Sequence, residues 1–276
     1  VLIVDEAHCL TEKSGLFNNY GENQIMEIIK SAKLSIFFID EQQRVHFNDI
    51  GTNENIKHFA KMYNAKVISM TLKSQFRCSG SNDYLNFVNH LLQINNEYNG
   101  EMINYNINVI ENPTRLMNII KELNTKENAR ILAGYCWDWN KKEVNNPDYH
   151  DIVIGDYEMS WNLGQAQTFA IDNSINEAGC IHSVQGLEFD YVGVIIGNDL
   201  KYKNGVVVAD FLNHASTDPS LRGLKKLMKK EPEKANAIAT QLIKNAYRVL
   251  LTRGIKGCFI YCVDKNLQSY FKQEIE

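Results

Sequence analysis

The stretch Val1 to Leu10, which reads VLIVDEAHCL, constrains the fold more than any other part of the chain. It opens with four apolar residues, three of them β-branched, and continues directly into Asp5 and Glu6. A short apolar run bounded by polar residues is typical of a strand buried in a parallel sheet. The carboxyl ends of parallel strands form the edge at which α/β proteins bind ligands. The stretch therefore predicts an α/β fold with two carboxylates at that edge.

An apolar strand followed by Asp-Glu is also the Walker B pattern of P-loop NTPases. In that pattern the first acid holds Mg²⁺ and the second activates the attacking water, roles that would fall to Asp5 and Glu6. The alternative is a buried strand that ends in two solvated acids, because short motifs also match by chance. The phosphate-binding loop G-x-x-x-x-G-K-[ST] does not occur in the 276 residues. Since the chain also starts on Val1 inside a core strand, we expect it to be the C-terminal part of a longer protein.

Length and composition allow two domains and exclude several classes of protein. A chain of 276 residues with 44% hydrophobic residues can fill two cores. The formal net charge of −4 gives no global basic field, so contact with a polynucleotide has to come from local patches. The six cysteines form no C-x-x-C pair, which favours reduced thiols in a cytoplasmic protein. No apolar run is long enough to span a membrane.

Hydrophobic periodicity predicts alternating strands and helices along the whole chain. The predicted strands cover 1–4, 35–39, 66–70, 106–110, 129–135, 191–196 and 257–263. The predicted helices cover 24–33, 53–63, 83–93, 115–123 and 234–251, the third of them capped by Ser79 or Ser81. Irregular alternation with two glycines predicts a hairpin insertion at 149–169. We expect Trp137 and Trp139 to form a small apolar core, with base stacking as the alternative.

Residues 200–234 are polar and contain the one cluster of positive charge, at Lys225, Lys226, Lys229 and Lys230. The simpler interpretation is a solvated helix face, and the alternative is local contact with phosphate. Upstream of this cluster, His182, Ser183, Gly186 and Glu188 belong to a polar loop that leads into a predicted strand.

Five strings resemble motifs II to VI of superfamily 1 helicases in the correct order. They are VLIVDEAH, FFIDEQQ, LKSQFRC, CIHSVQGLEFDYV and AYRVLLTRG, and they span residues 1 to 263. The residues of the first three strings are most similar to those of the Schlafen-like DNA/RNA helicase domain family. The resemblance implies two RecA-like (P-loop NTPase) domains with parallel sheets flanked by helices. Residues 1–74 would be the rest of the first domain, incomplete at its N-terminus, and 75–276 the second domain, with insertions near 140–170 and 200–234.

The resemblance also implies roles for individual residues, with ATP and Mg²⁺ as cofactors. Asp5 would bind Mg²⁺, Glu6 would polarise the attacking water and Gln43 would sense the γ-phosphate, although Ile39 replaces the usual glycine of that motif. Arg77 and Arg253 would act as arginine fingers. Gly186 and Glu188 would lie near the ribose and phosphates, and His182 and Ser183 near the nucleic-acid strand.

The function expected from the resemblance is an ATP-dependent helicase or translocase on single-stranded DNA or RNA, with a possible fused domain upstream. The alternatives are a nucleic-acid-stimulated NTPase that does not unwind, and a regulatory interaction module that no longer hydrolyses nucleotide. A first domain without its P-loop strand and helix would leave a sheet edge and an apolar face exposed.

Overall fold

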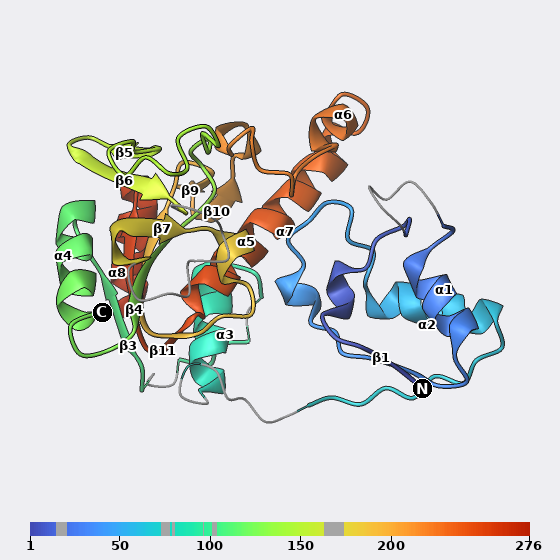
Figure 1. The fold of residues 1–276 in the computed structure, drawn as a ribbon. Coiled ribbons are helices and arrows are strands. Elements are labelled where there is room, and N and C mark those ends of the chain that lie inside the picture. The colour runs from blue at the N-terminus through green and yellow to red at the C-terminus, as the bar shows by residue number, and fades with distance from the viewer. Residues whose placement is uncertain (15–20, 73–77, 79–80, 96, 101–103, 163–173) are drawn as a thin grey trace.

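A computed structural model of the protein describes residues 1–14, 21–72, 78, 81–95, 97–100, 104–162 and 174–276. The chain has a mixed α/β fold, as predicted, and Figure 1 shows two parts side by side. Residues 1–72 form a small part built on a two-stranded parallel sheet, and the rest forms a larger part built on a seven-stranded sheet. The predicted boundary at residues 74 and 75 falls within 73–77, which lie outside the described residues.

The seven-stranded sheet is parallel except at one edge. Its strand order is β3-β11-β8-β4-β7-β6-β5, and only β5 and β6 pair antiparallel. The strands are β3 (Asn106–Val109), β4 (Ala129–Ala133), β5 (Ile152–Ile154), β6 (Tyr157–Trp161), β7 (Glu177–Gly179), β8 (Phe189–Ile196) and β11 (Gly254–Cys262). The strands predicted near β3, β4, β8 and β11 are confirmed, and β7 was not predicted.

Helices cover both faces of this sheet (Figure 1). One face packs against α4 (Pro113–Leu123), where Leu116 and Ile120 meet Ile131 of β4. Only glycine fits at position 193 of β8, because a Cβ on Gly193 would lie 2.8 Å from the Ile120 side chain. The other face packs against three helices whose apolar stripes join one core. They are α3 (Asn82–Leu91), α7 (Pro232–Leu251) and α8 (Lys265–Ile275), and α8 was not predicted.

The small part holds the stretch that opens the chain. Strand β1 (Leu2–Val4) pairs in parallel with β2 (Ser35–Phe37), in the register Leu2 opposite Ser35. Helices α1 (Gln24–Ser31) and α2 (Asn53–Met62) lie where the periodicity predicted them. Many large apolar side chains of this part are exposed, on the small sheet and outside it. They include Val1, Leu2, Ile3, Leu34, Ile36, Phe38, Met62, Val67, Ile68, Met70 and Leu72.

The strand predicted at 66–70 is wrong. Residues 65–72 form neither helix nor strand, and the side chains of Ile68 and Met70 are 73% and 89% exposed. A segment with strand-like composition forms a strand only where a neighbour accepts and donates its backbone hydrogen bonds. No strand among the described residues pairs with this segment.

The two predicted insertions have regular structure of their own. Strands β5 and β6 form the expected hairpin, and Gly155 at its turn has φ +59. Within 200–234 the chain forms the hairpin β9 (Leu200–Lys203) and β10 (Val206–Ala209), the 3₁₀ turn η7 (Phe211–Asn213) and the short helix α6 (Leu224–Met228). Trp137 packs against Trp161 in the apolar core near the first insertion, which supports the predicted structural role.

All six cysteines are free. Among the described helices, none combines the length and the apolar character that crossing a membrane requires.

Candidate functional site

The parallel pair β1 and β2 brings two polar segments to one edge of the small sheet. Asp5 and Glu6 follow β1, and the 3₁₀ turn η3 (Glu41–Gln43) follows β2. The backbone N–H of Ala7 donates to Phe38 O at 2.8 Å, which joins the two segments just beyond the strands. The carboxyl edge predicted from the sequence is therefore present, with Asp5, Glu6 and Gln43 on it.

Both carboxylates at this edge face solvent. The Glu6 backbone N–H donates to Asp5 Oδ1 at 2.9 Å, and the Glu6 side chain is 45% exposed. Glu6 adopts a left-handed backbone conformation, with φ 48 and ψ 42, which turns the chain sharply into the 3₁₀ turn η1 (Ala7–Cys9). Its Oε2 lies 3.2 Å from Nε2 of the buried His8. Non-glycine residues in this region of φ and ψ are uncommon and cluster at functional sites.

Gln43, in the turn after β2, is buried. Its Nε2 donates to Asp40 Oδ2 at 2.8 Å, while Asp40 Oδ1 accepts from Gln42 N at 3.0 Å and caps η3. The turn packs on α7, because Asn245 Nδ2 donates to Arg44 O at 2.8 Å. Gln43 therefore occupies a fixed position that the larger part of the protein helps to define.

Four of the predicted site residues lie on or just after the short helix α5 (Ile181–Val184). The Ser183 hydroxyl accepts from Cys180 N at 2.9 Å and donates to Cys180 O at 3.0 Å, so it caps the helix from a buried position. Gly186 has φ +85 and is exposed, and a Cβ there would meet nothing within 4 Å. Glu188 is also exposed. The backbone at Gly186 thus offers open space that a ligand can enter.

His182 is held by a residue from the 200–234 insertion. Its Nε2 lies 2.8 Å from Oδ1 of Asp218, and its ring stands 5.1 Å from the ring of His46. The His182 side chain is 25% exposed, whereas Asp218 is buried. One side chain of the larger part, His182, therefore touches both the small part and the insertion.

Asp218 belongs to a buried network that the sequence analysis did not identify. His214 lies between two carboxylates, with Nδ1 2.8 Å from Asp199 Oδ2 and Nε2 2.6 Å from Asp218 Oδ2. The Tyr247 hydroxyl of α7 donates to Asp199 Oδ1 at 2.5 Å. Because both ring nitrogens face carboxylate oxygens, both have to donate, and His214 is an imidazolium.

The titration of the network follows from its hydrogen bonds. Burial disfavours a charged His214, but its bonds to Asp199 and Asp218 outweigh burial and raise its pKa to about 9. Burial opposes a charged Asp218 in the same way, and bonds from His182 and His214 hold its pKa well below the ordinary value. No short motif predicts this cluster: His214 and Asp218 are four residues apart, but Asp199 and Tyr247 lie farther along the chain and join them only in the fold.

The two parts of the protein meet along a seam beside these residues. Gln185 Nε2 lies 4.0 Å from Cys9 Sγ, which places the loop after α5 against η1. Val45 of the small part packs with Ile181 and Val249 of the larger part. The segments that carry Asp5 and Glu6 on one side, and Gly186 and Glu188 on the other, therefore lie next to each other.

Arg253 is hydrogen-bonded within the larger part of the protein. It follows the end of α7 and is buried, with Nε donating to Val249 O at 3.1 Å and Nη1 donating to Leu187 O at 3.2 Å. The guanidinium is thus tied to the loop that contains Gly186 and Glu188. Arg77 lies outside the described residues.

The donors at the edge suit a nucleotide-bound Mg²⁺ better than an independent metal site. Mg²⁺ in phosphate-transfer sites uses one or two carboxylates together with substrate phosphates. Asp5 is an exposed carboxylate of this kind, and the described residues contain no group of three or more acidic, histidine or cysteine ligands. The residues therefore fit the metal and water side of a nucleotide site.

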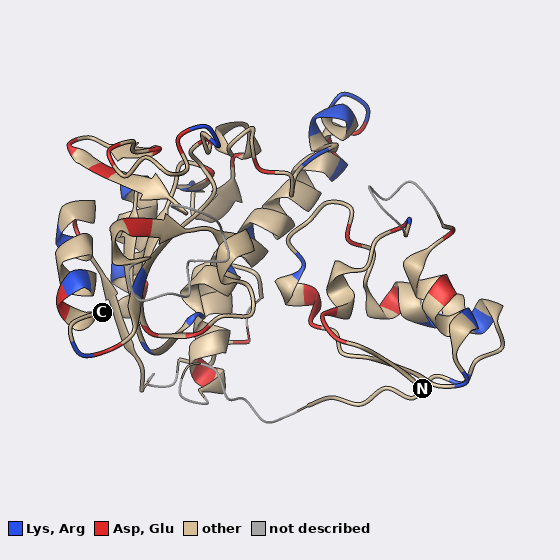
Figure 2. Cartoon of the chain, viewed as in Figure 1, with Lys and Arg blue, Asp and Glu red and all other residues tan. Residues whose placement is uncertain are grey.

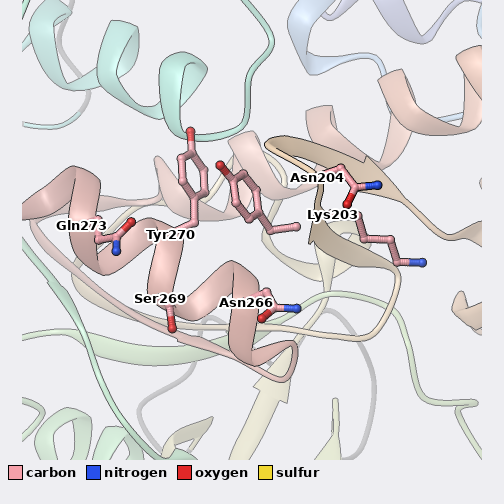
Figure 3. Close-up of a pocket in the computed structure, with 7 residues that line it drawn as sticks. Lys203, Asn204, Asn266, Ser269, Tyr270 and Gln273 are labelled. Atoms are coloured by element: carbon pink, nitrogen blue, oxygen red, sulfur yellow. The ribbon is translucent and has the colours of Figure 1, made fainter.

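A surface pocket of about 450 Å³ lies elsewhere, between β9 and α8 (Figure 3). The stacked rings of Tyr202 and Tyr270, 4.3 Å apart, form one side of it, and Lys203 and several amide side chains form the rest. No predicted site residue lines this pocket. The motif residues gather instead at the seam between the two parts.

The fold and this seam define the class of protein: an α/β protein with helicase-type motifs where two parts of the chain meet. The chain belongs to the family described as Schlafen group 3, DNA/RNA helicase domain, which its residues 1–264 match. It is also 25% identical, over 294 aligned residues, to the uncharacterized protein YPL245W of Saccharomyces cerevisiae. That alignment covers 97% of this chain and 63% of the yeast protein. The activity, substrates and partners of a whole protein of this kind are therefore proposals.

Proposed function

We propose that this chain forms the C-terminal portion of an ATP-dependent DNA or RNA helicase or translocase. The observation that carries the proposal is the pairing of β1 with β2, which brings Asp5, Glu6 and Gln43 to one edge beside the loop after α5. Membership of a DNA/RNA helicase domain family supports the same reaction class.

The proposed roles follow from position and chemistry. Mg²⁺, when bound with ATP, would neutralise charge on the transferred phosphoryl group. Asp5 would hold the metal, and the exposed Glu6 would orient and deprotonate the attacking water. Gln43, fixed by Asp40, would contact the γ-phosphate. Gly186 and Glu188 would border the nucleotide from the larger part.

Arg253 requires a conformational change under this proposal. Arg253 is now bonded to Leu187 O and Val249 O, so the loop and the end of α7 have to shift before the guanidinium can reach a γ-phosphate. RecA-like domain pairs that open and close a cleft provide such a shift. His182 and Ser183 would respond to the strand of nucleic acid beside the same loop.

The first prediction concerns ATP binding by residues 1–276. These residues carry no G-x-x-x-x-G-K-[ST] loop, so backbone N–H groups and a lysine that cradle the β- and γ-phosphates are missing from them. Asp5 and Glu6 alone repel a polyphosphate. We therefore expect no tight binding and no hydrolysis of ATP by this chain alone.

Calorimetric titration of the chain with Mg²⁺ and a non-hydrolysable ATP analogue tests this expectation. Micromolar binding would contradict the proposal, because it would show a phosphate cradle built from other residues. A longer native chain that includes the loop is expected to bind the analogue and to hydrolyse ATP. Stimulation of that hydrolysis by single-stranded nucleic acid would support the translocase, and hydrolysis that nucleic acid leaves unchanged would count against it.

A further inference from the structure

The surface formed by residues 222–230, which we call the basic arm, concentrates positive charge on an acidic chain (Figure 2). All of its charged side chains are exposed: Arg222, Lys225, Lys226, Lys229 and Lys230. The sequence from 219 to 230 contains no Asp or Glu. Within the described part of the chain, none of these five side chains belongs to an ion pair. The arm is therefore a positive surface that the fold itself does not neutralise.

This arrangement gathers like charges on and just after a short helix. Lys225 and Lys226 lie on α6, Lys229 and Lys230 follow its last residue, Met228, and their positive charges repel one another. Helix α6 has only five residues, so intrinsic propensity stabilises it little. A mixed-charge surface would avoid the repulsion, and an external polyanion would remove it.

The arm has a fixed position in the fold. Leu224 is fully buried in the main core, and Leu221, Leu227 and Met228 pack against that core. Just before the arm, Ser220 O accepts from Phe47 N of the small part at 2.7 Å. Asp218, two residues earlier, holds both His182 and His214. The positive surface is thus attached to the seam and to the helix that carries His182.

The chemistry of the arm favours the backbone of a polynucleotide. Lysine binds phosphate as a point charge, and phosphate contacts position a strand without reading its sequence. Residues 219–230 contain no aromatic side chain on which a base can stack. A membrane surface fits less well, because an interfacial helix needs an apolar face toward the lipid, and the apolar residues of α6 are turned into the core.

We propose that the basic arm binds the phosphate backbone of single-stranded nucleic acid, without base preference, and guides the strand toward His182. That the polymer is a nucleic acid rests on the proposed function, whereas the place of contact rests on the arm alone.

The test compares three forms of the 276-residue chain by fluorescence anisotropy, with labelled U20 and dT20 strands between 25 and 200 mM KCl. In the arm variant, Lys225, Lys226, Lys229 and Lys230 are each replaced by Gln. In the control variant, four exposed lysines on α2 and α4 or just after it are replaced by Gln: Lys57, Lys61, Lys121 and Lys126. Each variant loses four positive charges, so both have the same net charge.

We expect the parental chain to bind weakly and with strong salt dependence, because phosphate contacts release counterions. For single strands each contact contributes about 0.7 to the slope of log K against log salt. Loss of two or three contacts in the arm variant should make the slope shallower by about 1.4 to 2.1, and should weaken binding at 0.1 M salt by about 25- to 100-fold. The control variant should stay within about threefold of the parent.

Four results would overturn the inference. If the arm variant binds the strands as tightly as the parental chain does, the contact lies elsewhere. If both variants lose the same amount of affinity, the loss comes from net charge and not from the arm. An arm that binds anionic lipid vesicles but neither strand would assign it to a membrane. If the parental chain binds neither strand at 25 mM KCl, the nucleic-acid part of the proposed function fails as well. If the parental chain binds and the arm variant binds equally well, only the inference about the arm fails and the proposed function stands.

Discussion

Replacing Glu6 with glutamine is expected to lower kcat for ATP hydrolysis by about 10²- to 10⁴-fold, the range for loss of a general base. Glutamine keeps the shape of the side chain but cannot accept a proton from the attacking water. Because Glu6 is 45% exposed and follows β1, its replacement should not affect folding. The Kd for nucleotide should change little, since the loss falls on the transition state.

Steady-state hydrolysis by a nucleotide-binding native form of the protein measures this effect, with nucleotide binding followed separately. Glu12→Gln is the matched control, because Glu12 is exposed, close in the sequence and not part of the carboxyl edge. Hydrolysis at the parental rate by the Glu6 variant would remove Glu6 from the proposed mechanism. It would favour the alternative in which this fold serves as a regulatory module.

Replacing Asp218 with asparagine is expected to lower the free energy of unfolding by about 3–5 kcal/mol, the range for breaking a buried ion pair. The asparagine leaves the buried imidazolium of His214 with a single carboxylate, Asp199. It also replaces one of the two carboxylate oxygens that face His182 and His214 with an NH₂ group, which cannot accept a hydrogen bond. Asp138→Asn is the control: Asp138 accepts from Ser216 and Thr217 of the same insertion, but it is exposed, and its replacement should cost less than about 1 kcal/mol.

The pH dependence gives this prediction a second readout. The pKa of His214 is raised in the folded state to about 9, so the folded chain holds a proton that the unfolded chain releases near pH 6.5. This contribution to stability is complete below pH 6.5 and is lost as pH rises through about 9. Asp218 has a lowered folded pKa, so its contribution is complete above its ordinary pKa and is lost as pH falls.

Urea unfolding at pH 6 and pH 9 measures the difference. Between these values the parent should lose more stability than Asp218→Asn, by up to about 3 kcal/mol, because the variant keeps only Asp199 to hold the His214 proton. Comparing parent and variant at each pH cancels the lysines, tyrosines and cysteines that titrate in both. An identical pH dependence in the two proteins would show that Asp218 does not raise the pKa of His214.

The local pattern of the chain was sufficient to predict most of the fold. The spacing of apolar residues located α1, α2, α3, α4 and α7 and the main strands. Apolar residues have to face a core, and they recur about every 3.6 residues in a helix and every second residue in a strand. The prediction at 66–70 failed for the opposite reason: a strand depends on a partner that its own residues do not specify. Helix α8 and strand β7 were missed.

For the candidate site, the sequence by itself determined which residues carry the motifs and, through the parallel strands β1 and β2, that Asp5, Glu6 and Gln43 share an edge. Only the tertiary structure decided what surrounds them. It placed the loop after α5 against η1, and it turned Arg253 into the interior. It also placed His214 between Asp199 and Asp218. Contacts within one strand or helix follow from spacing along the chain, whereas an ion pair between distant segments forms only when the packing of whole elements brings its partners together.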